Sequence, residues 1–220
     1  MILSGPSAFQ HQNGIQLPKK AGRAGVLVIH SWWGRTSSIV EFSSALVREG
    51  FAVAVADLFD GQIANTEAEA RALRKRPGRK PMYRHLEANL SALREAIQSD
   101  QPKIGVVGFS MGGHWAIWLS QKPEYEISAT VLYYAARAGD FSCCQSQFIA
   151  HFAENDPWVS PKTRRNMETA ILRAGCPYQP FDYPGTGHWF AECGRHEEFQ
   201  AESAVLAFER TIRHLRNTLA

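Results

Sequence analysis

A serine at position 110 stands between two segments of different local preference, within the sequence Gly-Phe-Ser-Met-Gly of residues 108–112. The apolar run before it, residues 103–107, is typical of a buried strand, and the residues after it continue as a helix. Gly108 and Gly112 allow a sharp turn between the two, because a side chain at either position would collide with the neighbouring strand or helix. The pattern predicts a strand–turn–helix element that holds Ser110 in a strained, exposed position with its Oγ clear of the sheet.

The rest of the chain alternates between predicted strands and predicted helices. Apolar or β-branched runs predict strands over residues 25–30, 51–56, 103–107, 127–134, 147–153 and 178–183. Helical patterns cover residues 36–49, 62–76, 82–98, 111–121, 161–174 and 197–215, and the segment 77–81 with its two prolines separates the second helix from the third. Such alternation is typical of an α/β fold with a mostly parallel central sheet and helices on both faces. We expect a single domain over residues 1–220, with a hairpin or an extended segment over residues 1–24.

The net charge and the distribution of basic residues indicate which classes of binding partner to expect. The net charge is only +3, so no general attraction to nucleic acid or to a membrane surface is expected. Arginine and lysine are concentrated between residues 71 and 84, where a solvated helix face is the favoured interpretation. An anionic substrate or nucleic acid is the alternative for that segment.

Cysteine spacing and the N-terminal sequence bear on cofactors and location. The four cysteines show no Cys-x-x-Cys pairing, so we expect no metal site, and nothing in the sequence indicates a cofactor. No apolar run approaches the roughly 20 residues that span a bilayer, and no signal-peptide pattern is visible. A cytoplasmic protein with reduced thiols is therefore expected.

A serine hydroxyl becomes a good nucleophile only when a base takes its proton, and the usual base is an imidazole. Among the eight histidines, His188 lies in a glycine-rich segment directly after the last predicted strand. We expect the other histidines that we weighed to be elsewhere: His11, His85, His196 and His214 on the solvated surface, His114 pointing away from Ser110, and His151 as a hydrogen-bonded core residue.

A third group is needed to hold the imidazole in the correct tautomer. Asp156 follows the strand predicted over residues 147–153 and is our candidate, with Glu154 a weaker one. The alternative for Asp156 is that it only starts a turn before Pro157. The order Ser110, Asp156, His188, each after its own strand, is the order of the α/β-hydrolases.

Acyl transfer also needs donors for the oxyanion that forms in the transition state. The Met111 amide, at the start of a helix, is one candidate donor, and the Trp32 amide, in the loop after the first central strand, is the other. Side chains near these positions are expected to line the substrate pocket, namely Ser31, Trp33, Trp158 and Trp189. For the side chains of Trp32 and Trp33, a place in the core is an equally good interpretation.

Taken together, these segments resemble the dienelactone hydrolase family of α/β-hydrolases. Five motifs carry the resemblance between residues 25 and 190: Val-Ile-His-Ser-Trp-Trp-Gly ending at Gly34, Ala-Asp-Leu-Phe of residues 56–59, Gly-Phe-Ser-Met-Gly-Gly of residues 108–113, Glu-Asn-Asp-Pro of residues 154–157 and Tyr-Pro-Gly-Thr-Gly-His of residues 183–188. The resemblance implies an α/β-hydrolase fold without a large lid domain and the hydrolysis of small esters or lactones.

The sequence departs in two respects from what the resemblance implies. The family's usual nucleophile is a cysteine accompanied by a glutamate in the oxyanion loop, and here Ser110 and Ser31 stand at those positions. A substrate-binding arginine is expected shortly after the catalytic histidine, but residues 189–192 read Trp-Phe-Ala-Glu. Dienelactone itself is therefore not the expected substrate.

The sequence thus predicts a serine hydrolase that cleaves a small ester, thioester or lactone through an acyl-enzyme, as a monomer or weak homo-oligomer. One alternative is a catalytically inactive binding protein on the same fold. Another is a hydrolase of a different bond, such as a peptide.

Overall fold

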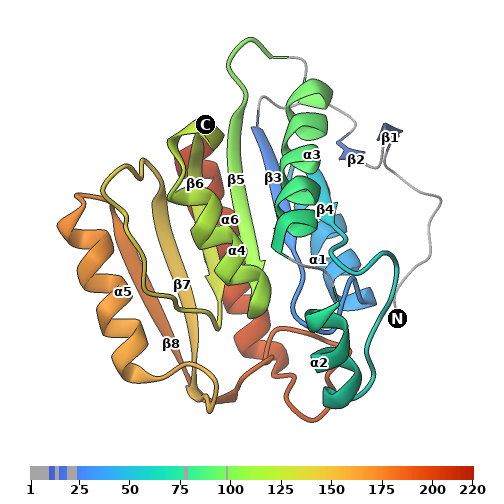
Figure 1. Cartoon of the computed structure of the whole chain (residues 1–220), viewed down its shortest axis with the longest axis vertical. Coiled ribbons are helices and arrows are strands. Elements are labelled where there is room, and N and C mark those ends of the chain that lie inside the picture. The colour runs from blue at the N-terminus through green and yellow to red at the C-terminus, as the bar shows by residue number, and fades with distance from the viewer. Residues whose placement is uncertain (1–9, 13–14, 19–23, 77–78, 98) are drawn as a thin grey trace.

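The computed structural model describes residues 10–12, 15–18, 24–76, 79–97 and 99–220. Within these residues, eight strands form one sheet, with helices packed beside it (Figure 1). The strand order is β1-β2-β4-β3-β5-β6-β7-β8. The six strands from β4 to β8 pair in parallel, and β1 and β2 add an antiparallel edge. The strands are β1 (Gln10–Gln12), β2 (Ile15–Leu17), β3 (Ala24–Ile29), β4 (Ala52–Ala56), β5 (Lys103–Phe109), β6 (Ile127–Tyr133), β7 (Gln147–Asn155) and β8 (Tyr178–Gly187).

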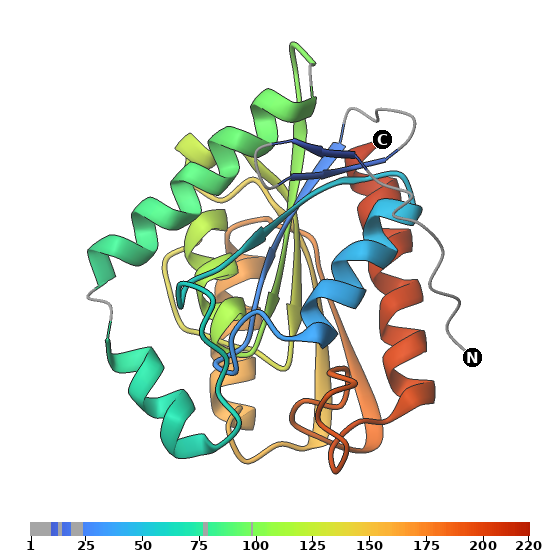
Figure 2. The same cartoon turned by 90° about the vertical axis from the view of Figure 1, so that its right-hand side faces the viewer.

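Helices cover both faces of the sheet, which confirms the predicted fold class. Figure 2 shows α1 and α6 on one side of the sheet and α3 and α4 on the other. Residues 26–29 of β3 are fully buried, as expected of a strand covered on both faces. The helices are α1 (Ser37–Arg48), α2 (Glu67–Lys75), α3 (Arg79–Ile97), α4 (Met111–Ser120), α5 (Pro161–Arg173) and α6 (Ala201–Leu219), and a short 3-10 helix, η1, spans Pro123–Tyr125. In the part of the chain that the structure describes, no helix is long and apolar enough to cross a bilayer.

Several helix boundaries differ from the predicted ones for local reasons. α2 begins five residues later than expected, because Thr66 and Glu69 form a capping box at its N-terminus. α3 begins at Arg79 and keeps Pro81 in its first turn, where the missing N–H costs nothing. α6 is shifted towards the C-terminus by four residues at each end.

The predicted N-terminal segment lies partly outside the described residues. Within it, β1 and β2 pair antiparallel, with Gln10 opposite Leu17, and β2 joins the sheet edge where Gln16 lies opposite Val53 of β4. Residues 1–9, 13, 14 and 19–23 are not described.

The carboxyl ends of the parallel strands lie along one edge of the sheet. β7 and β8 extend further than expected, to Asn155 and Gly187, so that two loops leave the sheet side by side, with Asn155 opposite Gly187 in the strand register. In open α/β sheets this edge is where ligands bind. The predicted site residues all follow strands that end there.

Candidate active site

The turn between β5 and α4 has the strained geometry that the glycines predicted. Ser110 adopts φ 49° and ψ −109°, a conformation that side-chain-bearing residues rarely adopt. A Cβ on Gly108 would lie 2.4 Å from the carbonyl oxygen of Gly112, and one on Gly112 would lie 2.2 Å from that of Ile29. The Ser110 amide donates to the Tyr133 carbonyl at 2.9 Å, so the end of β6 holds the strained residue in place.

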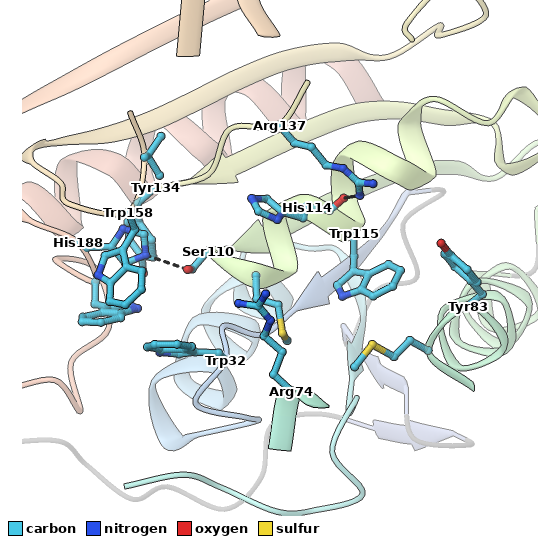
Figure 3. A pocket seen from close by; sticks show the side chains of 14 residues that line it. Trp32, Arg74, Tyr83, Ser110, His114, Trp115, Tyr134, Arg137, Trp158 and His188 are labelled. Carbon is cyan, nitrogen blue, oxygen red and sulfur yellow. Dashed lines mark hydrogen bonds between the residues drawn. The ribbon is translucent and has the colours of Figure 1, made fainter. Parts of the chain in front are cut away.

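Ser110, His188 and Asp156 come together from three loops. His188 Nε2 lies 2.8 Å from Ser110 Oγ, the contact drawn as a dashed line in Figure 3. His188 Nδ1 lies 2.8 Å from Asp156 Oδ2 and 2.9 Å from Oδ1. The side chains of His188 and Asp156 are 3% and 5% exposed, so little water competes for these hydrogen bonds. The arrangement can transfer a proton from the serine hydroxyl to an imidazole held by a carboxylate.

Asp156 has a second set of partners in its own turn. Its Oδ1 accepts the backbone amides of Trp158 at 2.8 Å and Val159 at 3.1 Å. The two interpretations of this residue are therefore compatible, since one carboxylate both shapes the turn around Pro157 and bonds the imidazole. Glu154 is exposed and accepts the amide of Gly185 at 2.8 Å. Its carboxylate supports the loop before His188.

The loop after β3 forms a tight turn around the proposed oxyanion donor. The Gly34 amide donates to the Ser31 carbonyl at 3.2 Å, and Gly34 has a φ of 95°. In such a turn the amide of the second residue, here Trp32, is not used by the turn itself. The Met111 amide is in the first turn of α4, where helix amides have no intrahelical acceptor. Both amides are thus candidates to bind an anion.

His30 anchors this loop, a role that the sequence did not reveal. Its Nδ1 lies 2.6 Å from the Ser31 carbonyl, and its Nε2 lies 3.0 Å from the Leu58 amide. Because the carbonyl only accepts and the amide only donates, the ring is neutral with its hydrogen on Nδ1. Burial lowers the pKa of His30 to about 4, which agrees with that assignment.

A cavity of about 410 Å³ opens beside Ser110 (Figure 3). The predicted lining residues Trp158 and Trp189, together with Trp32, face it, and Ser110, Met111 and His188 lie in its wall. Ser31 and Trp33 do not fit the expectation, because both are buried behind the lining, at 0% and 1% exposed. The lining residues are Trp32, Arg74, Met82, Tyr83, Ser110, Met111, His114, Trp115, Tyr134, Arg137, Trp158, Val159, His188 and Trp189.

Two further residues, His114 and Arg74, line the cavity although the sequence did not predict them there. His114 was expected to point away from Ser110, yet it lines the same cavity. The reason is that residues four apart on a helix share a face, so a side chain one turn into α4 lies on the same side as Ser110. Arg74, from the basic segment expected to be solvated, is exposed and also lines the cavity.

The remaining histidines are spread over the molecule. His151 is buried and bonded to the hydroxyls of Tyr183 at 2.7 Å and Thr211 at 3.1 Å, as expected of a core residue. His85 and His196 are exposed, whereas His214 is partly buried with its Nε2 3.1 Å from the Gln147 carbonyl. The side chain of His11 lies outside what the structure describes. Among the described residues, no three His, Cys, Asp or Glu side chains are grouped as metal ligands.

Glu192 is the second residue near the site that sequence reasoning missed. It is 1% exposed and accepts hydrogen bonds from Ser31 and Tyr134. Burial raises its pKa to about 7. The only signal in the sequence was an acidic residue at the end of an otherwise apolar segment, Trp-Phe-Ala-Glu of residues 189–192.

The sheet order, the helices on both faces and the strained serine turn define an α/β-hydrolase fold. A solved structure titled as the dienelactone hydrolase-like promiscuous phosphotriesterase P91, from metagenomic libraries, superimposes with a TM-score of 0.80 at 18% identity, covering 94% of this chain and 92% of that chain. The model of the dienelactone hydrolase family matches residues 13–219, so the chain belongs to that family.

Two curated relatives match nearly the whole chain. A protein of Aquifex aeolicus named "Putative carboxymethylenebutenolidase" is 26% identical over 214 residues, 93% of this chain and 92% of that protein. A protein of a Bradyrhizobium species named "Probable 2-oxo-3-(5-oxofuran-2-ylidene)propanoate lactonase" is 23% identical over 206 residues, 87% of this chain and 82% of that protein. With the family established, the chain is a hydrolase of ester bonds.

Proposed function

We propose that this protein hydrolyses a small carboxylic ester, thioester or lactone through an acyl-enzyme formed on Ser110. The observation that supports the proposal most strongly is the hydrogen-bonded chain from Ser110 Oγ to His188 Nε2 at 2.8 Å and from His188 Nδ1 to Asp156 at 2.8 Å. It stands at the carboxyl edge of the sheet, beside a cavity and on a strained serine turn. Together these features are what a serine nucleophile with its base needs on a fold of this kind.

The proposed reaction has two steps. Ser110 Oγ attacks the carbonyl carbon while His188 Nε2 takes the hydroxyl proton, and the amides of Trp32 and Met111 stabilise the negative oxygen. The intermediate collapses, the bond to the leaving group breaks, and His188 gives its proton to the departing oxygen or sulfur. A water molecule then attacks the acyl-serine while His188 takes its proton; the bond to Ser110 Oγ breaks, His188 gives the proton to Oγ, and the acid and free Ser110 are released.

The position of His188 gives the substrate a direction in the cavity. The leaving group must lie on the His188 side of Ser110, because it receives its proton from Nε2. On that side the indoles of Trp158 and Trp189 lie 6.3 and 4.9 Å from the imidazole, measured between ring centroids. The acyl group then extends towards Tyr83 and Trp115 at the other end (Figure 3). A cavity of about 410 Å³ suits a small molecule.

The decisive experiment replaces the nucleophile. Ser110→Ala should keep the circular dichroism spectrum and lower kcat on an ester substrate by about 10³-fold or more. A fluorophosphonate probe should label the wild type and not the variant, and Ser142→Ala, at an exposed loop serine, is the matched control. Retention of near wild-type turnover by Ser110→Ala would refute the proposal. A panel of esters, thioesters, lactones and peptides would identify the bond cleaved.

A further inference from the structure

One buried carboxylate joins three separate segments behind the candidate active site. Glu192 Oε2 accepts the Ser31 hydroxyl at 2.9 Å, and Oε1 accepts the Tyr134 hydroxyl at 2.9 Å. These partners are 161 and 58 residues away in the sequence. The carboxylate therefore ties the turn after β3 and the end of β6 to the segment that follows His188.

Both partners of this carboxylate adjoin groups that the proposed reaction uses. Ser31 immediately precedes Trp32, whose amide is the proposed oxyanion donor. The Tyr134 ring lies against the His188 imidazole, with 4.8 Å between the ring centroids. Glu192 itself is not among the residues that line the cavity, so any effect on catalysis passes through these partners.

The hydrogen-bond pattern is best satisfied when Glu192 is ionised. A carboxylate only accepts, and here each oxygen faces one hydroxyl donor. A protonated carboxyl has to donate its own hydrogen to Ser31 Oγ or to Tyr134 Oη. That hydroxyl must then turn its hydrogen elsewhere in a buried space, which is costly without another acceptor. Protonation of Glu192 therefore reverses the donor and acceptor in one of its two hydrogen bonds, to Ser31 or to Tyr134.

We propose that Glu192 is a positioning residue whose ionised carboxylate holds the Ser31–Trp32 turn and the Tyr134 ring in register with His188. The inference rests on the proposed acyl-enzyme reaction of Ser110, because that reaction supplies its readout. An oxyanion donor acts only when it is aimed at the developing charge, and displacements of about 1 Å are costly. The expected effect is on kcat rather than on substrate binding.

Burial and the neighbouring groups together set the pKa of the Glu192 carboxyl. Burial raises the pKa of Glu192 to about 7, against hydrogen bonds from Ser31 and Tyr134 and the attraction of Arg195, while Glu198 adds to the rise. Arg195 also lies 3.4 Å from Glu198, so the two charges partly offset each other. The positioning charge is therefore gained and lost near neutral pH.

The Tyr134 phenol does not compete for this proton in that range. Burial, followed by the nearby Glu192 carboxylate, raises the pKa of the Tyr134 phenol well above its usual value. Asp156 also contributes to that rise from beyond the ring, next to His188. The phenol thus stays a donor throughout the neutral range.

The test compares wild type with Glu192→Gln on one ester from about pH 5.5 to about pH 8.5. Glutamine resembles the protonated carboxyl, so the two proteins should agree within about twofold at the acid end. At the alkaline end the wild-type kcat should be about tenfold higher, because hydrogen bonds to an ionised acceptor are the stronger ones. KM should change by less than about twofold. The ratio of the two kcat values should rise with a midpoint near the pKa of Glu192, about 7.

Control variants separate this role from simple packing. Glu197→Gln removes an exposed carboxylate of the same segment that is not among the charges acting on Glu192, and its ratio to wild type should not vary with pH. Ser31→Ala and Tyr134→Phe each remove one hydrogen bond to Glu192, and their loss of kcat relative to wild type should also grow with pH. If Glu192→Gln does not fold, these two variants test the proposal in its place. A ratio that is constant with pH in these variants, or a loss confined to KM, would overturn the proposal. Full activity of Ser110→Ala would instead overturn the proposed function.

Discussion

Replacing Asp156 by asparagine tests the proposed role of this residue, because the structure dictates how the amide must sit. Asp156 Oδ1 accepts two backbone amides, from Trp158 and Val159, and Oδ2 lies 2.8 Å from His188 Nδ1. An amide nitrogen cannot take the Oδ1 position, because two N–H donors already point at it. It therefore takes the Oδ2 position, 2.8 Å from Nδ1, where its hydrogen favours the tautomer in which Nδ1 accepts over the one in which Nδ1 donates to Oδ1 at 2.9 Å.

That geometry removes the base from the proposed mechanism. With Nδ1 accepting, the neutral imidazole carries its hydrogen on Nε2, which is 2.8 Å from Ser110 Oγ. Nε2 then cannot take the hydroxyl proton, and no negative charge balances the imidazolium. The expected loss in kcat is about 10⁴-fold, or about 5.4 kcal/mol at 1.36 kcal/mol for each factor of ten. The turn at residues 156–159 keeps its two amide bonds, so the free energy of unfolding should change by less than about 1 kcal/mol.

Steady-state kinetics on an ester and urea unfolding measure the two quantities separately. Glu154→Gln is the matched control, because Glu154 is exposed and a glutamine oxygen can still accept the Gly185 amide. It should cost less than about threefold in kcat. Equal losses in the two variants would mean that Asp156 does not orient the imidazole. A large drop in stability of Asp156→Asn would show that the turn, rather than the tautomer, is what the substitution damages.

Two further predictions concern stability. Gly112→Ala should lower the free energy of unfolding by about 3 kcal/mol or more, because the new Cβ would lie 2.2 Å from the Ile29 carbonyl oxygen. Gly187→Ala is the control and should cost less than about 1 kcal/mol, because its new Cβ would lie 3.9 Å from the nearest atom, the Asn155 carbonyl oxygen. Equal urea midpoints for the two variants would contradict this prediction. The second prediction uses Glu192, whose pKa rises from 4.5 to about 7 on folding, so that its contribution favours folding at low pH and is lost as the pH rises through that interval. Burial lowers the pKa of His30 and His151 to about 4 and about 3, which acts in the opposite direction and destabilises the fold as pH falls below the ordinary imidazole value. Glu192→Gln removes the opposing contribution, and its unfolding free energy should fall on acidification more steeply than that of wild type, by about 1.4 kcal/mol per pH unit within the interval; parallel curves would contradict it.

The fold class could be predicted because its determinants are local. A buried parallel strand requires a continuous apolar run, and residues 26–29 show one that is fully buried in the structure. Element ends were less predictable, since they depend on single hydrogen bonds. Thr66 and Glu69 set the start of α2 by a reciprocal pair of bonds that the hydrophobic pattern does not contain.

The proximity of Ser110, Asp156 and His188 followed from topology rather than from any contact visible in the sequence. Each residue comes after a parallel strand, and such strands end at the same edge of the sheet. Their catalytic roles stay predictions that the substitutions above test. The cavity wall was harder to anticipate, because burial depends on which way a turn faces. Trp32 and Trp33 are neighbours in the chain, yet only Trp32 lines the cavity, while Trp33 packs under the guanidinium of Arg195 at 3.9 Å.

Glu192 shows why a buried polar network is hard to predict from sequence and how it can still affect the geometry of the candidate active site. An isolated carboxylate in an apolar segment is unfavourable unless donors reach it, so its presence implies partners without naming them. Here the donors come from the turn after β3 and the end of β6, two segments that already carry the proposed oxyanion amide and the ring beside His188. The same contacts that compensate for burying the charge therefore couple its ionisation to the geometry of the site. Substitutions at Ser31 or Tyr134 should for this reason alter the pH dependence of catalysis, although neither side chain takes part in the bond-making steps.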